Sequence, residues 1–208
     1  MTFMILAKAA TPALRAPFHT WMDQEFPARY EGRIAGCTVT LASPSAHEAA
    51  YDTLVEGDAA SPALLAELRE AFTRQGAEMS VYAVRRMVEK APPAPRRDAV
   101  KFVACIRPRP DLSPDEIRRR WNAHVPLALR IHIGVSRYVR NWVDDLILSS
   151  SPAPIPYCGI ATMAFHTEDD YRDRLYDRPE NEQVILNDVA TFMAGVDSFL
   201  GRESVVVW

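Results

Sequence analysis

SPDEIRRRWNAHVPLALRIHIGVSRYVRN, the stretch from residue 113 to residue 141, carries the strongest structural signals of the chain. Ser113 is followed by a proline at the first helical position and a glutamate that completes a capping box, so a helix should begin here. We expect this helix to reach about His124 and to break before Pro126, because the residue before a proline avoids helical geometry. A glycine then leads into a predicted strand, Val135–Asn141.

One face of the predicted helix combines apolar residues with a histidine. Ile117, Trp121 and His124 follow one another at i, i+4 and i+7, so they share a face. A histidine in this position is either a hydrogen-bonded core residue or a general acid or base, because its ordinary pKa lies near neutrality. Both readings of His124 stay open at this point.

The strand that follows is polar on one face. If Val135 and Val139 point toward the helices, period-two alternation turns Ser136, Tyr138 and Arg140 to the opposite face. A strand with so many polar side chains should be covered by a polar ligand or by a second sheet.

Composition excludes several classes of protein. The chain has 208 residues, of which 48% are hydrophobic and 25% charged, which is ordinary for a globular protein. A net charge of −3 gives no electrostatic reason to expect a nucleic-acid or membrane partner. Three scattered cysteines and five histidines make no ligand-spaced cluster, which argues for free thiols and against a metal site.

The first ten residues contain only a short apolar run without the basic residues of a signal peptide, so they predict a strand. No later stretch approaches the length of a membrane span. We therefore expect a cytoplasmic protein.

Apolar runs and helical periodicity predict the order β-α-β-β-α-β twice. A proline-rich segment, residues 90–98, separates the two copies, so we expect domains at 1–89 and 99–208. Helices are expected at residues 18–26, 61–75, 113–124, 167–176 and 180–200. Strands are expected at 2–8, 36–43, 51–56, 78–87, 101–107, 134–141, 157–165 and 203–208.

The two copies share residues as well as pattern, which indicates a tandem repeat. The matched pairs are Trp21 with Trp121, Gly36 with Gly134, Tyr51 with Tyr157, and Glu78 with Glu203. A β-α-β-β-α-β unit places both helices on one face of an antiparallel sheet and leaves the other face bare. We therefore predict an α+β fold in which two ferredoxin-like repeats pack their sheets face to face as a barrel with a cavity.

W-N-A-H-V-P-L at residues 121–127 and G-V-S-R-Y-V-R-N at residues 134–141 resemble the EthD family. The resemblance covers about residues 100–208 and includes the strand start Tyr157–Gly159 and the segment Asp188–Phe192. The first half resembles a degenerate copy of the same domain, because a glutamine or glutamate stands where the histidine would fall. This asymmetry argues for one functional cavity per chain, built mainly by the second half.

The resemblance implies the dimeric α/β-barrel (ferredoxin-like) superfamily. Its members include polyketide cyclases, cofactor-free monooxygenases, lactone isomerases and haem-binding enzymes, so the fold does not fix the function. Three functions follow as alternatives. The first is a cofactor-free lyase, isomerase, cyclase or oxygenase acting on a small hydrophobic or aromatic substrate. The second is a non-catalytic ligand-binding or accessory protein of a catabolic or polyketide pathway. The third is a haem-binding member of the superfamily.

For the first alternative we predict His124 and Tyr138 as catalytic residues and Trp121, Asn141 and Arg140 as substrate-binding residues. His124 should lie partly exposed at a pocket mouth, with Tyr138 or Asn141 within reach. No cofactor and no metal are expected. The expected partners are a small-molecule ligand and a second copy of the chain in a homodimer.

Overall fold

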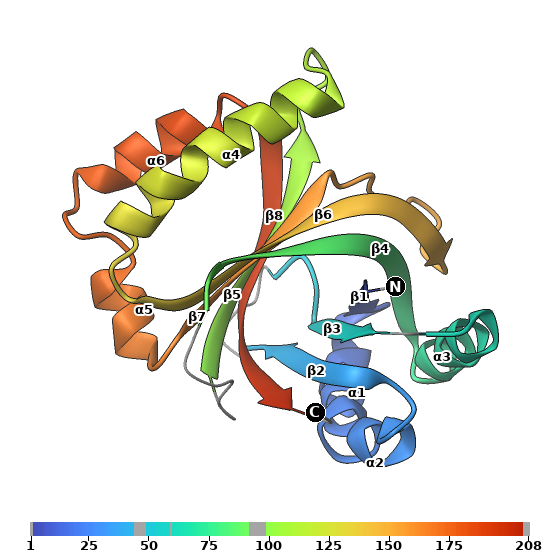
Figure 1. The fold of residues 1–208 in the computed structure, drawn as a ribbon. Helices are drawn as coiled ribbons and strands as arrows, with labels where there is room; N and C mark the ends of the chain where they lie inside the picture. The colour runs from blue at the N-terminus through green and yellow to red at the C-terminus, as the bar shows by residue number, and fades with distance from the viewer. Residues whose placement is uncertain (1, 44–48, 59, 92–98, 206–208) are drawn as a thin grey trace.

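The computed structural model describes residues 2–43, 49–58, 60–91 and 99–205, and Figure 1 shows their arrangement. Both halves follow the order β-α-β-β-α-β, except that the first half has two helices after its first strand and the second half has two helices before its last strand. The first half contains β1 (Thr2–Ala9), α1 (Pro12–Gln24), α2 (Phe26–Tyr30), β2 (Ala35–Ala42), β3 (Thr53–Asp58), α3 (Pro62–Arg74) and β4 (Ala77–Lys90). The second half contains β5 (Ala99–Pro108), α4 (Pro114–Ile131), β6 (Val135–Ser149), β7 (Gly159–Phe165), α5 (Glu168–Arg174), α6 (Asn181–Val189) and β8 (Met193–Val205).

The strands of the described residues form one closed barrel in the order β1-β3-β2-β8-β5-β7-β6-β4. Each half contributes four neighbouring strands, and all pairings are antiparallel. The halves join where β2 pairs with β8 and where β4 pairs with β6. The predicted α+β barrel fold is thereby confirmed, and the two sheets are also hydrogen-bonded to each other along both edges.

The helices lie outside the barrel (Figure 1). α4 and α6 run side by side over the strands of the second half, while α1, α2 and α3 lie against the first half. An apolar core fills the space between helices and strands in each half, and a third core fills the centre of the barrel. The first core includes Phe18, Trp21, Phe26 and Phe72, the second Trp121, Trp142, Phe165 and Phe192, and the third Leu54, Tyr82, Val103, Ile160 and Phe199.

Two predicted boundaries are wrong. α4 does not break before Pro126 but continues to Ile131, because Val125, Ala128 and Ile131 extend its buried apolar face beyond the proline. The helix expected to reach residue 200 ends at Val189. Its last predicted part belongs to β8, which pairs along the whole length of β5.

Strand register allows the two halves to be compared position by position. Leu6 on β1 pairs with Ser80 on β4, and Cys105 on β5 pairs with Asp197 on β8. Since β1 and β5 open their respective halves, Ser80 and Asp197 hold equivalent positions on the last strand of each half.

Leu6 and Cys105 also align β3 with β7. Leu6 pairs with Leu54 on β3, and Cys105 pairs with Ile160 on β7. Tyr51 and Tyr157 each lie three residues before these positions. The two tyrosines therefore hold equivalent places in the two halves, as the comparison of their sequences suggested.

The predicted match of Glu78 with Glu203 is wrong. Glu203 lies six residues after Asp197 on β8. The residue six positions after Ser80 on β4 is Arg86, so Arg86, and not Glu78, is equivalent to Glu203. The two glutamates looked equivalent because β8 was expected to begin only at residue 203.

The proposed division of the chain at residues 90–98 stays a prediction. Lys90 belongs to β4, and residues 92–98 lie outside the described part of the chain. Among the described residues, no helix is long and apolar enough to cross a membrane.

Candidate functional site

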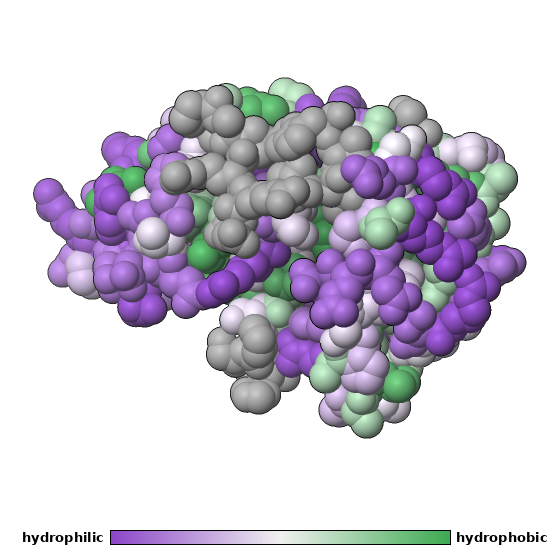
Figure 2. All heavy atoms as spheres, turned by 90° about the horizontal axis from the view of Figure 1, so that it is seen from below, coloured by the Kyte–Doolittle hydropathy of each residue, from purple (hydrophilic) through white to green (hydrophobic). Residues whose placement is uncertain are grey.

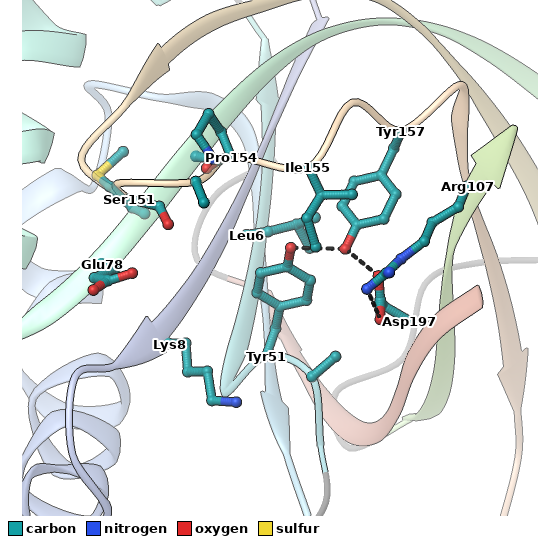
Figure 3. Close-up of a pocket in the computed structure, with 14 residues that line it drawn as sticks. Leu6, Lys8, Tyr51, Glu78, Arg107, Ser151, Pro154, Ile155, Tyr157 and Asp197 are labelled. Carbon is teal, nitrogen blue, oxygen red and sulfur yellow. Dashed lines mark hydrogen bonds and ion pairs between the residues drawn. The ribbon is translucent and has the colours of Figure 1, made fainter. Parts of the chain in front are cut away.

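A pocket of about 310 Å³ lies at the end of the barrel where β3 and β7 begin (Figure 3). We call it the barrel-end pocket. Strands of both halves and the segments before β3 and β7 contribute to its wall, so neither half forms it alone. Its apolar lining includes Leu6, Met79, Pro154 and Ile155. Its polar lining consists of Lys8, Tyr51, Glu78, Ser80, Arg107, Ser151, Tyr157 and Asp197.

Four of these polar side chains form one hydrogen-bonded chain (Figure 3). The hydroxyl oxygens of Tyr51 and Tyr157 lie 2.8 Å apart. Tyr157 donates to Oδ2 of Asp197 at 2.6 Å. Arg107 donates to both oxygens of that carboxylate, at 2.6 Å from Nε and 2.7 Å from Nη2. This bidentate contact fixes the carboxylate in one orientation.

The direction of the chain follows from the number of protons available. A tyrosine hydroxyl has one proton to donate. Tyr157 donates its proton to Asp197, so Tyr51 must be the donor in the contact between the two tyrosines. The Tyr51 oxygen is then left with lone pairs that can accept a hydrogen bond from a molecule in the pocket.

The charges of the chain follow from its surroundings. Burial opposes ionisation of Asp197, but the hydrogen bonds from Arg107 and Tyr157 outweigh it and lower the pKa of this carboxyl. Burial raises the pKa of Tyr157, and its bond to the carboxylate raises it further. Burial also raises the pKa of Tyr51. At neutral pH the carboxyl is charged and both tyrosines keep their protons.

The rest of the barrel interior is filled. Tyr82 donates to the carbonyl of Ile155 at 3.0 Å, which holds one wall segment of the pocket in place. Beyond the pocket, apolar side chains occupy the centre of the barrel. A ligand in the barrel-end pocket is therefore confined to that end.

A buried ionic group lies beyond the apolar centre. Lys101 is 1% exposed and forms ion pairs with Glu56 and Glu203, and Arg137 also pairs with Glu203. Burial opposes ionisation of Glu56, but Lys101 outweighs it and lowers the pKa to about 2. Two carboxylates and two cations balance each other, which makes this group a structural feature of the barrel.

His124 does not lie at a pocket mouth. It is 6% exposed, and its Nδ1 lies 2.7 Å from Oδ2 of Asp188 on α6. Burial lowers its pKa, although Asp188 opposes this effect. The prediction of a partly exposed histidine is wrong because α4 continues through Pro126, and the chain does not bend over the edge of the sheet there.

Tyr138 faces the helices and not the interior of the barrel. A bulge between Val135 and Arg137 shifts the pairing of β6 with β7, so Val135 and Tyr138 both pack into the core beneath the helices. Burial raises the pKa of Tyr138 to about 12. The predicted alternation is wrong because a bulge adds one residue to the strand and reverses the faces beyond it.

Arg140 and Trp121 belong to the same helix-facing layer. Arg140 is 3% exposed and donates to Glu89 and Asn122. Its guanidinium lies 5.4 Å from the ring centres of Trp121 and Trp142, a cation–π arrangement. The side chains of Arg140 and Trp121 are thus held by contacts with other described residues.

Asn141 lies between Arg140 and Trp142 on β6, so its side chain points to the opposite face of the strand, toward the barrel interior. It is 0% exposed, and its Nδ2 donates to the carbonyl of Ile160 at 3.1 Å. None of the five predicted site residues lines the barrel-end pocket. Their catalytic and substrate-binding roles stay predictions.

The described residues form no metal-binding cluster, and the barrel-end pocket offers no histidine to a haem. No group of three or more His, Cys, Asp or Glu side chains among them is placed to bind a metal ion. The lining of the barrel-end pocket contains no histidine. His124 and His132 are buried and bonded to Asp188 and to the carbonyl of Leu175, respectively.

Reasoning from the sequence missed the barrel-end pocket, although one signal pointed to it. Tyr51 and Tyr157 were matched as equivalent residues of the two halves but were given no role. Such a pair can meet when two equivalent halves close around one cavity. Arg107, Asp197 and Lys8 gave no signal of their own, because their proximity depends on the closure of the barrel.

The comparison with protein families matches residues 109–195 to the EthD domain. This segment contains α4, β6, β7, α5 and α6, and it includes Tyr157. The other members of the hydrogen-bonded chain, Tyr51, Arg107 and Asp197, lie outside it. No curated protein matches the sequence.

Solved structures resemble the chain over almost its full length. An anthrone oxidase-like protein has a TM-score of 0.62 at 14% identity, covering 99% of this chain and 92% of that one. A mutant chlorite dismutase from Candidatus Nitrospira defluvii has a TM-score of 0.54 at 9% identity, with 99% and 91% covered. A proposed monooxygenase from Lactobacillus acidophilus NCFM has a TM-score of 0.52 at 8% identity, with 99% and 97% covered.

At such low identity these structures show the fold alone, that of the α/β-barrel proteins. The family match is independent evidence for relatedness, because it rests on the amino-acid sequence of the second half and not on the fold. Residues 109–195 of this chain match the EthD domain, and they lie within a barrel that the chain closes by itself.

Proposed function

We propose that this chain is a cofactor-free EthD-like enzyme that binds a small hydrophobic or aromatic molecule with an acidic hydroxyl in the barrel-end pocket and withdraws the hydroxyl proton. The observation that carries the proposal is the continuous hydrogen-bonded chain from Tyr51 through Tyr157 to Asp197. The pocket volume, about 310 Å³, lies at the small end of the range for ligand sites.

The proton moves along the chain in three coupled transfers. The substrate hydroxyl donates to the Tyr51 oxygen, and its proton passes to Tyr51 as the Tyr51 proton passes to Tyr157. The Tyr157 proton passes in turn to Asp197. The products are a substrate oxyanion and a neutral Asp197 carboxyl, so no proton is gained or lost overall.

The electrostatics limit the substrates to acidic hydroxyls. Hydrogen bonds from Arg107 and Tyr157 keep the pKa of Asp197 below its ordinary value, which makes this carboxylate a weak base. A weak base removes a proton more readily from an acidic hydroxyl, such as that of an enol or an activated phenol, than from an alcohol. The apolar lining by Leu6, Met79 and Ile155 suits the hydrocarbon part of such a molecule.

An enolate or phenolate is the shared intermediate of several cofactor-free reactions, including isomerisation, cyclisation and attack on dioxygen. The neighbours described as an anthrone oxidase-like protein and a monooxygenase lend support to an oxygenase. They do so only through a similar fold, so the reaction that follows proton removal stays open.

Anthrol, the enol of anthrone, provides a test, because it carries the kind of hydroxyl proton that the chain would remove. Its conversion to anthrone in anaerobic D₂O runs through the enolate, places deuterium on the acidic carbon and is followed by NMR, with and without the protein. We expect the wild type to accelerate this conversion. Tyr51→Phe and Asp197→Asn should lose about 100-fold or more of that acceleration, the usual contribution of general acid–base catalysis. Asp115→Asn is the matched control, because this side chain is 92% exposed and does not line the barrel-end pocket.

Two outcomes would overturn the proposal. Binding of anthrol without accelerated conversion would favour the ligand-binding alternative. Loss of the acceleration in His124→Asn, with Asp197→Asn unaffected, would move the chemistry to the pair of His124 and Asp188, whose contact at 2.7 Å is the geometry of a histidine oriented by a carboxylate.

A further inference from the structure

Two cations hold equivalent positions at the barrel-end pocket. Lys8 lies two residues after Leu6 on β1, and Arg107 lies two residues after Cys105 on β5. Both side chains line the pocket (Figure 3). The first and second halves therefore each bring one positive charge to the same end of the barrel.

Their partners differ. Arg107 forms a bidentate ion pair with Asp197. The residue equivalent to Asp197 in the first half is Ser80, whose hydroxyl bonds to that of Ser149 at 2.9 Å. The first half thus places a neutral serine where the second half places the carboxylate. The charge of Lys8 acts on Asp197 across the pocket, but that carboxylate is paired with Arg107, and no ion pair joins Lys8 to a described acidic residue.

No other acidic residue of the described chain pairs with Lys8 as Asp197 pairs with Arg107. Glu78 stands opposite Lys8 in the register, but Figure 3 shows their side chains pointing apart, and no ion pair joins them. Asp52, at the same end of the barrel, is held by Arg15 at 2.6 Å and by the backbone N–H of Ala9 at 2.8 Å. The cation of Lys8 is therefore available to a ligand.

We propose that the ligand itself supplies the missing carboxylate. Its carboxylate pairs with Lys8, as Asp197 pairs with Arg107, and its hydroxyl donates to Tyr51. The substrate class is then a small hydroxylated aromatic or enolic carboxylic acid. This inference rests on the proposed function for the position of the hydroxyl, and the pairing with Lys8 is independent of the proton transfer.

The test compares two probes of nearly the same shape, 3-hydroxybenzoate and 3-hydroxybenzamide, by isothermal titration calorimetry at pH 7. The first carries the carboxylate, and the second replaces it with a neutral amide. We expect the wild type to bind the benzoate about two- to fivefold more tightly, the modest preference that an exposed lysine provides. Lys8→Met should remove this preference. Arg69→Met, which deletes one charge from the exposed face of α3, should preserve it.

A second variant adds a carboxylate to the pocket. Ser80→Asp places an acidic side chain at the position equivalent to Asp197, where it can neutralise Lys8, so it should also remove the preference for benzoate. An equal preference in wild type and Lys8→Met would overturn the inference. Equal affinity of the wild type for both probes would overturn it too, while leaving the hydroxyl contact of the proposed function intact. Failure of both probes to bind would contradict both proposals.

Discussion

Tyr51 and Tyr157, which are 106 residues apart in the chain, meet hydroxyl to hydroxyl at 2.8 Å. Each stands just before an equivalent strand of its half, and their contact lies where the two halves enclose the barrel-end pocket. The contact links the halves through side chains, in addition to the backbone pairing of β2 with β8 and β4 with β6.

This contact leads to a prediction for stability. Tyr157→Phe removes the donor to Asp197 and the acceptor of Tyr51 together, and Tyr157 is only 4% exposed. Tyr51→Phe removes one bond of a half-buried side chain. We expect Tyr157→Phe to lower the free energy of unfolding by about 1–3 kcal/mol and Tyr51→Phe by no more than about 1 kcal/mol, measured by urea denaturation. Equal losses would show that the bond from Tyr157 to Asp197 adds nothing to stability.

Lys101 should be among the most sensitive positions of the barrel. Lys101→Met leaves Glu56 and Glu203 buried without the cation that they share. Removing one partner of a buried ionic group typically costs about 3–5 kcal/mol. Chemical denaturation would measure this loss. Arg85→Met, which breaks an exposed pair with Asp144, serves as control and should cost less than about 1 kcal/mol.

The same group gives the barrel an acid-sensitive contribution. The pKa of Glu56 is about 2 in the folded chain, against an ordinary value of 4.5. The unfolded chain therefore binds the proton first, so this contribution to stability is present above about pH 4.5 and is lost as the pH falls toward 2. Unfolding free energies measured between pH 5 and pH 2.5 should fall less steeply in Glu56→Gln than in the wild type.

His124 should make the free energy of unfolding depend on pH in a different range. Burial lowers its pKa below the ordinary value of 6.5, so the unfolded chain takes up a proton that the folded chain refuses. Stability should therefore fall as the pH drops below about 6.5, and His124→Asn should weaken this dependence. Denaturation series from pH 7.5 to pH 5 would show it, with the exposed His166→Asn as control. An unchanged slope in His124→Asn would contradict the prediction.

Gly159 is expected to tolerate no side chain. A Cβ atom there would lie 2.3 Å and 2.6 Å from ring atoms of Trp121, which is itself stacked against Phe192. We expect Gly159→Ala to destabilise the second half by about 1–3 kcal/mol, as overpacking usually does. At Gly195 the added atom would meet only the flexible side chain of Arg107, at 3.8 Å. Gly195→Ala is therefore the control, and a thermal melt compares the two.

The sequence was a better guide to the fold than to the site. Element order and amphipathic faces are local properties, and they predicted the α+β barrel before any contact was known. The faces of Tyr138 and Arg140 depend on a single bulge in β6, which no local pattern announced. The exposure of His124 depends on whether the helix survives Pro126, which the packing of α4 against its neighbours decides.

The barrel-end pocket lay beyond such reasoning for a further reason. Its polar residues come from β1, β4, β5, β8 and the segments before β3 and β7, so their proximity follows from the closed strand order. On the coloured part of the face shown in Figure 2, hydrophilic side chains predominate, and hydrophobic ones lie singly or in small groups.

Closure of the barrel within one chain has a genetic consequence. In a barrel assembled from two copies of one polypeptide, every mutation alters two equivalent positions at once. Here a single codon governs Ser80 and another governs Asp197, although the two residues occupy equivalent places. Selection can therefore change the charge of one wall of the pocket while the other wall keeps its residues.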